Sequence, residues 1–170
     1  MNWMKKVAVA LVCLLPLGLQ AAKVDTLQVK SPSMNKSIEV VVVSPDVAAT
    51  KACPVIYLLH GYGGNARTWV GIKPDLPKIA DEKGIFFVCP DGKNTWYWDS
   101  PLNADVRYET FISDELVKYV DSHYKTVADR KGRAITGLSM GGHGAMWNGL
   151  RHSDVFSAAG STSGGVGICL

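Results

Sequence analysis

Short apolar runs alternate along this chain with segments of helical periodicity, and this alternation constrains the fold more than any other feature. Residues 54–61, PVIYLLHG, and 84–92, GIFFVCPDG, are unbroken apolar runs that end in glycine-bearing turns, as expected of strands buried on both faces of a parallel sheet. The segment between them, PDLPKIADEKG, predicts a short helix that ends at Gly84. The alternation therefore predicts a mostly parallel sheet with helices on both faces.

The remaining segments extend the same pattern. Residues 24–30 and 36–43 predict two antiparallel strands around a Ser-Pro-Ser-Met-Asn turn. Residues 108–124 place apolar side chains at intervals of three and four, which predicts an amphipathic helix. A strand, GRAIT, precedes a helix over about 140–151, and residues 156–165, FSAAGSTSGG, begin another strand. With 170 residues, 47% of them hydrophobic, the chain suits one globular domain.

The first 22 residues have the layout of a secretory signal peptide. Two lysines precede an apolar run from Val7 to Leu19, and the small residues Ala21 and Ala22 follow it. The apolar run is shorter than the ~20 residues that a membrane-spanning helix needs. We therefore predict export to the periplasm or the cell exterior, no stable membrane anchor after cleavage, and a mature domain over residues 23–170.

Charge and cysteine usage narrow the range of partners. Removing the signal takes away two lysines and leaves 16 basic and 15 acidic residues, a balance that attracts neither nucleic acid nor an anionic membrane surface. Cys53 begins one predicted strand and Cys89 ends its parallel neighbour, so at ~3.3 Å per residue they lie roughly 15 Å apart. A disulfide needs Cα atoms within about 7 Å. We expect both thiols to be free and assign no role to Cys169.

The stretch AITGLSMGGHGAMW, residues 134–147, contains the pattern GxSxG around Ser139. A strand, a sharp turn and a helix in that order form a nucleophile elbow, in which the serine takes a strained backbone conformation and its hydroxyl projects from the carboxyl edge of the sheet. Gly137 and Gly141 are expected because a side chain at either position would collide with a neighbouring helix or strand. The context predicts that Ser139 is a nucleophile.

A second glycine-rich turn, HGYGG at residues 60–64, follows a strand that should neighbour the strand before the serine. Acyl transfer needs N–H donors at the oxyanion of the tetrahedral intermediate, each worth about 3 to 4 kcal/mol. We assign these donors to the main-chain amides of Tyr62 and Met140, and we expect His60 to brace the loop.

Other chemistries fit the sequence less well. Residues 61–66 match the GxGxxA dinucleotide fingerprint and Asp91 closes the next strand, but a glycine and two prolines interrupt the helix that this fingerprint requires. The four histidines form no zinc-ligand pattern. His143 and His152 follow Ser139, but not in the order nucleophile, acid, histidine. We therefore predict no cofactor, no metal ion and no general base from these histidines.

An aromatic loop follows the strand that ends near residue 90. Its sequence, DGKNTWYWDSP at 91–101, brings Trp96, Tyr97 and Trp98 to the edge of the sheet that bears Ser139. Contact with a sugar ring or an aryl acyl group explains such a cluster as well as ordinary packing does.

Several of these motifs together resemble the esterase family related to esterase D: HGYGG with Trp69 downstream, WYWDSP, ISDELVKYVDSHY, GLSMGGHGA and FSAAGSTSGG. This family includes acetylxylan and feruloyl esterases of carbohydrate esterase family 1, tributyrin-type esterases, S-formylglutathione hydrolases and mycolyltransferases. The resemblance, over about residues 24–166, implies an α/β-hydrolase fold and an acyl-enzyme on Ser139. The expected substrate contacts are His60, Gly61, Trp69, Trp96 and Trp98.

Members of this family usually continue past the point where this sequence stops, through the last strands and the loops that bear the catalytic acid and histidine. We therefore expect an α/β-hydrolase domain lacking its last strands, an exposed edge strand near 156–161, and weak or no hydrolysis by this chain alone. The predicted activity is that of an exported serine esterase acting on small-molecule or polysaccharide esters, with acetyl, feruloyl or short acyl groups. Acyl transfer to a sugar or lipid, and a non-catalytic carbohydrate-binding or degenerate protein, stay open as alternatives.

Overall fold

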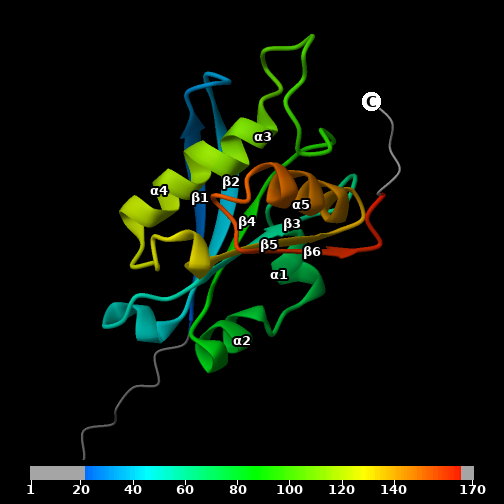
Figure 1. Cartoon of the computed structure of the whole chain (residues 1–170). Coiled ribbons are helices and arrows are strands. Elements are labelled where there is room, and N and C mark those ends of the chain that lie inside the picture. The colour runs from blue at the N-terminus through cyan, green and yellow to red at the C-terminus, as the bar shows by residue number, and fades with distance from the viewer. Residues whose placement is uncertain (1–21, 166–170) are drawn as a thin grey trace, which may run out of the picture.

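The computed structural model of this chain describes residues 22–165 and contains a six-stranded sheet in the order β1-β2-β4-β3-β5-β6 (Figure 1). The predicted signal peptide, apart from Ala22, and Cys169 lie outside the described residues. The strands are β1 (Lys23–Ser31), β2 (Lys36–Ser44), β3 (Val55–Leu59), β4 (Phe86–Pro90), β5 (Arg133–Leu138) and β6 (Ala158–Thr162).

Strand directions agree with the sequence patterns. β1 and β2 form the predicted antiparallel pair, with Gln28 opposite Glu39, and β2 also runs antiparallel to β4. The other neighbours, β4 with β3, β3 with β5 and β5 with β6, are parallel. The carboxyl ends of four parallel strands therefore meet at one edge of the sheet, where the loop after β3 and the turn after β5 lie side by side.

Helices cover both faces of the sheet, as predicted (Figure 1). One face is covered by α1 (Thr68–Ile72) and α2 (Leu76–Lys83), which ends at Gly84 in the left-handed conformation. The other is covered by the helical segment of residues 108–123 and by α5 (Met140–Arg151). The segment 108–123 consists of α3 (Tyr108–Thr110), a π-helical turn η2 (Phe111–Glu115) and α4 (Leu116–His123). Short 3₁₀ turns occupy η1 (Asp46–Ala49) and η3 (Arg130–Gly132).

The valine run in β2 shows how the sequence builds a two-faced core. Successive side chains of a strand point to opposite faces, so Val40 and Val42 pack under α4 while Val41 and Val43 pack toward α2. Cys53 and Cys89 are both buried free thiols, as predicted. Burial raises the pKa of the Cys89 thiol.

Strand β6 lies at the outer edge of the described sheet. It pairs with β5 and, within residues 22–165, with no other strand. Most of its side chains are exposed, which agrees with the edge strand expected near residues 156–161. No helix among residues 22–165 is long and apolar enough to cross a membrane.

Candidate active site

Ser139 lies in the sharp turn between β5 and α5, exposed to solvent, with backbone dihedral angles φ 55° and ψ −117°. A positive φ is unfavourable for a residue with a Cβ atom and is typical of strained functional turns. The turn is held on both sides, because Ser139 N donates to Thr162 O at 2.8 Å and His143 N donates to Ser139 O at 3.0 Å. The predicted elbow is therefore present, with the hydroxyl at the helix N-terminus.

The glycines of the motif allow the elbow to pack closely. A Cβ atom on Gly141 would overlap the main-chain carbonyl of Leu59 in β3, and one on Gly137 would overlap the main chain of Gly141. These are backbone neighbours, which cannot move aside as a flexible side chain does. A side chain at either position would therefore collide with main-chain atoms, as expected from the sequence. The two glycines allow α5 to pack directly on β3.

The loop after β3 lies against the elbow. A Cβ atom on Gly61 would come within 3.5 Å of Ser139 Cβ. Neither Tyr62 N nor Met140 N donates a hydrogen bond to another group in residues 22–165. Two unpaired amides flank the serine, which is the arrangement an oxyanion hole requires. Their catalytic role stays a prediction.

His60 supports this loop from behind. Its ring is 1% exposed, so its expected contact with substrate is corrected to a bracing role. Nδ1 lies 2.7 Å from Gly61 O, and Gly92 N donates to Nε2 at 2.9 Å. A carbonyl only accepts and an amide only donates, so Nδ1 carries the proton and the ring is neutral. Asp91 Oδ1 lies 3.4 Å from Nε2.

The aromatic side chains of the loop after β4 differ in burial. Tyr97 is fully buried: its hydroxyl donates to His60 O at 3.1 Å, and its ring fills the space that side chains on Gly92 and Gly144 would need. Trp96 and Tyr97 both have positive φ, 58° and 61°. This strained pair of residues turns the chain so that Tyr97 enters the core while Trp96 stays half-buried beside α5.

Three tryptophans surround His143, one turn beyond Ser139. The ring centroids of Trp96, Trp98 and Trp147 lie 5.4, 6.0 and 6.1 Å from the His143 ring. His143 Nδ1 lies 2.7 Å from Gly165 O, and buried Nε2 has no partner within residues 22–165. No side chain in that range hydrogen-bonds to Ser139 Oγ, so His143 is not paired with the nucleophile.

Trp69 lies away from this cluster. It belongs to α1 and packs on the core of the opposite face, together with Ala66 and Leu76. Trp69 therefore packs on the face of the sheet opposite the His143 cluster, and its contact with substrate stays a prediction. Sequence spacing alone did not reveal this, because the face that α1 covers depends on how the loop after β3 turns.

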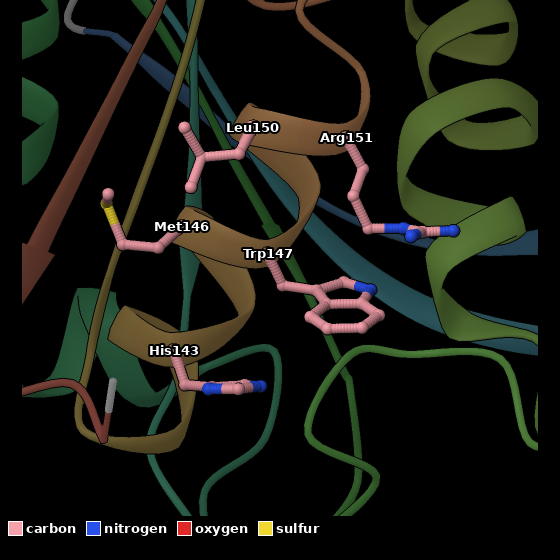
Figure 2. Close-up of a pocket in the computed structure, with 5 residues that line it drawn as sticks. All are labelled: His143, Met146, Trp147, Leu150 and Arg151. Atoms are coloured by element: carbon pink, nitrogen blue, oxygen red, sulfur yellow. The ribbon is translucent and has the colours of Figure 1, made fainter. Parts of the chain in front are cut away.

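A groove of 470 Å³ runs along the outer face of α5 (Figure 2). Figure 2 shows side chains from successive turns of the helix along this groove. Leu150 is 71% exposed, and the Arg151 guanidinium lies 4.9 Å from the Trp147 ring. The groove begins beside the elbow and is mainly apolar. Its lining residues are His143, Met146, Trp147, Leu150 and Arg151.

Glu109 anchors the far end of this surface and was not singled out from the sequence. Its carboxylate accepts hydrogen bonds from Trp147 Nε1 at 2.7 Å and Arg151 Nε at 2.8 Å, and lies 2.8 Å from His152 Nε2. Burial opposes its ionisation, but the hydrogen bonds outweigh burial and lower its pKa. A charged residue among the apolar positions of the 108–124 helix was the available signal.

The described residues show no metal site. Within 22–165, no group of three or more His, Cys, Asp or Glu side chains is placed to hold a metal ion.

Comparisons with known proteins agree with this geometry. Residues 31–169 match the model of the Esterase family, described as "Putative esterase". The esterase Rv1288 of Mycobacterium tuberculosis is 30% identical over 144 residues, covering 81% of this chain and 31% of that protein. The diacylglycerol acyltransferase/mycolyltransferase Ag85A of Mycobacterium leprae is 32% identical over 155 residues, covering 83% and 44%.

A solved ferulic acid esterase superposes with a TM-score of 0.69 at 32% identity, covering 82% of this chain and 61% of that one. The fold is thus that of the α/β-hydrolase esterases. The chain spans less than two thirds of the length of each of these proteins.

Proposed function

This chain belongs to the Esterase family, and we propose that it is the nucleophile-bearing part of an exported serine esterase that forms an acyl-enzyme on Ser139. The observation that supports this most directly is the exposed Ser139 at φ 55°, with the unpaired amides of Tyr62 and Met140 beside it. Acetyl, feruloyl or short acyl esters of carbohydrates are the proposed substrates, in keeping with the similarity to a ferulic acid esterase.

In the proposed reaction, Ser139 Oγ attacks the ester carbonyl and its proton passes to a base. The carbonyl oxygen becomes an oxyanion that accepts hydrogen bonds from the amides of Tyr62 and Met140. Collapse of the intermediate expels the alcohol, which takes up a proton, and water then releases the acid in a second addition and collapse. No side chain in residues 22–165 contacts Oγ as a base, so we expect weak hydrolysis by this chain alone.

Covalent labelling tests the nucleophile without requiring turnover. The chain is incubated with an alkyl fluorophosphonate and its intact mass is followed over time and pH. We expect one adduct, mapped to Ser139 and absent in Ser139→Ala, at a rate that rises with pH because solvent hydroxide replaces the side-chain base. Ser163→Ala is the matched control, since Ser163 is also exposed with a positive φ of 53°. Labelling that persists in Ser139→Ala refutes the assignment.

Acyl transfer to an alcohol is a second candidate, favoured by the similarity to Ag85A. Product analysis in the presence of a sugar or diacylglycerol acceptor distinguishes the two reactions, since a transferase yields the new ester and a hydrolase yields the free acid.

A further inference from the structure

A second cavity, of 330 Å³, opens at the same edge of the sheet as Ser139. We propose that this cavity binds the neutral oligosaccharide chain that carries the ester. The inference rests on the proposed function and specifies its alcohol portion. The residues that carry the argument are Gln28, Glu39, Asn65, Arg67, Asp91 and Lys93.

The lining supplies both hydrogen-bond donors and acceptors around a volume typical of ligand sites. Gln28 and Glu39 are partners across β1 and β2, so their side chains stand next to each other on one face of the sheet. Asn65 Oδ1 accepts from Arg67 N at 2.8 Å, and within residues 22–165 no bond to protein engages Asn65 Nδ2 or the Gln28 carboxamide. Carboxamides and carboxylates of this kind pair with sugar hydroxyls, which both donate and accept.

Charge in the cavity is balanced. Arg67 Nε lies 3.6 Å from Glu39 Oε1, and Lys93 Nζ donates to Asp91 Oδ2 at 2.5 Å. Two cations face two carboxylates, which leaves no net charge to attract an anionic or cationic ligand. A polyhydroxylated neutral ligand matches this chemistry better than a phosphate or an acidic polysaccharide.

The cavity shares its wall with the candidate oxyanion loop. Asn65 and Arg67 belong to that loop, and Gly63 N donates to Asn94 Oδ1 of the neighbouring turn at 2.7 Å. Tyr62, 67% exposed, lies in the same loop, three residues before Asn65. A ligand in the cavity therefore extends along the loop that flanks Ser139.

Strand order sets the distance between the cavity and the serine. Asp91 follows β4, two strands from β5, and Glu39 lies on β2, three strands away. At about 4.8 Å per strand, β4 and β2 are offset sideways from β5 by roughly 10 and 14 Å. An ester on an oligosaccharide reaches both places at once, whereas a methyl or ethyl ester reaches only the serine.

Calorimetric titration of the whole chain with xylotetraose, cellotetraose and mannotetraose tests the proposal without needing turnover. We expect at least one of them to bind, with a dissociation constant that rises about tenfold in Glu39→Ala and in Arg67→Ala, each of which loses hydrogen bonds to the ligand. Lys73→Ala, which removes an exposed cation paired with Asp75 outside the cavity, should leave the constant unchanged. Thermal unfolding confirms that each variant is folded.

Absence of binding by all three oligosaccharides overturns the proposal, as does unchanged affinity in both cavity variants. Binding of tetragalacturonate as tightly as the neutral sugars also overturns it. Fluorophosphonate labelling of the same samples separates the two inferences: labelling of Ser139 without sugar binding refutes the cavity alone, and sugar binding without labelling refutes the nucleophile alone.

Discussion

The main chain of Gly61 lies against the side chain of Ser139, so close that a Cβ atom on Gly61 would come within 3.5 Å of Ser139 Cβ. This contact joins two segments that are far apart in the sequence. It follows from the parallel pairing of β3 with β5, in which Leu59 stands opposite Gly137. The loop that begins at His60 and the elbow therefore leave the sheet together.

Replacing Tyr62 by proline removes one proposed oxyanion donor while breaking no hydrogen bond to residues 22–165. We expect the rate of Ser139 labelling to fall by about 10²- to 10³-fold. Tyr62→Ala keeps the amide and should retain most of the rate. Labelling kinetics of the two variants, compared at equal thermal stability, measure the difference. Equal rates for proline and alanine would show that this amide does not face the reacting oxygen.

Backbone strain at Ser139 predicts an unusual stability ranking. Glycine adopts a φ of 55° freely, whereas alanine keeps the strain of serine. We expect Ser139→Gly to raise the free energy of unfolding by roughly 1 kcal/mol relative to Ser139→Ala. Urea unfolding of both variants tests this. A glycine variant less stable than the alanine variant would mean that the turn is relaxed.

Two glycines distinguish close packing from open space. Gly141→Ala places a methyl group on the carbonyl of Leu59, and we expect a loss of about 3 kcal/mol or more. Gly71→Ala meets nothing within 4 Å in helix α1, and its helix propensity should raise stability by up to about 1 kcal/mol. Thermal unfolding of both proteins provides the measurement. Similar shifts for the two would contradict the packing of α5 on β3.

Low pH should destabilise the protein at Asp91, which lies beside His60 behind the candidate oxyanion loop. Burial opposes ionisation of Asp91, but hydrogen bonds from Lys93 Nζ and from the main-chain amide of Lys93 outweigh burial and lower its pKa to about 2. A carboxylate whose pKa is lower in the folded state than in the unfolded state stabilises the fold at pH values above the unfolded pKa of about 4. This stabilisation is lost as the pH falls through the pKa of the folded state. We expect a loss of roughly 2 kcal/mol between pH 5 and pH 2.

In Asp91→Asn, this loss of stability between pH 5 and pH 2 should be smaller. The measurement is the free energy of unfolding as a function of pH. Asp75→Asn is the control: a hydrogen bond from Lys73 lowers the pKa of Asp75, but the pair is exposed and screened by solvent. If Asp91→Asn loses as much stability between pH 5 and pH 2 as the unmodified chain does, other carboxylates cause the loss.

Patterns that act over a few residues were readable from the sequence. The valine run of β2, the glycine after α2 and the GxSxG turn each depend on local conformational preference, so strands, helices and the elbow appeared where expected. The parallel sheet followed because strands separated by helices require right-handed crossovers. The predicted exposure of Ser139 follows from the same local geometry.

Only the tertiary structure decided which aromatic and polar side chains face the solvent. The loop after β4 carries three neighbouring aromatic residues, WYW. The positive φ of Trp96 and Tyr97 turns the Tyr97 ring into the space beside Gly92 and Gly144. Trp69 packs on the opposite face of the sheet. Glu109 accepts hydrogen bonds from Trp147 and Arg151 of α5, more than thirty-five residues away in the sequence. Burial is settled by contacts between residues distant in the sequence, which local periodicity does not encode.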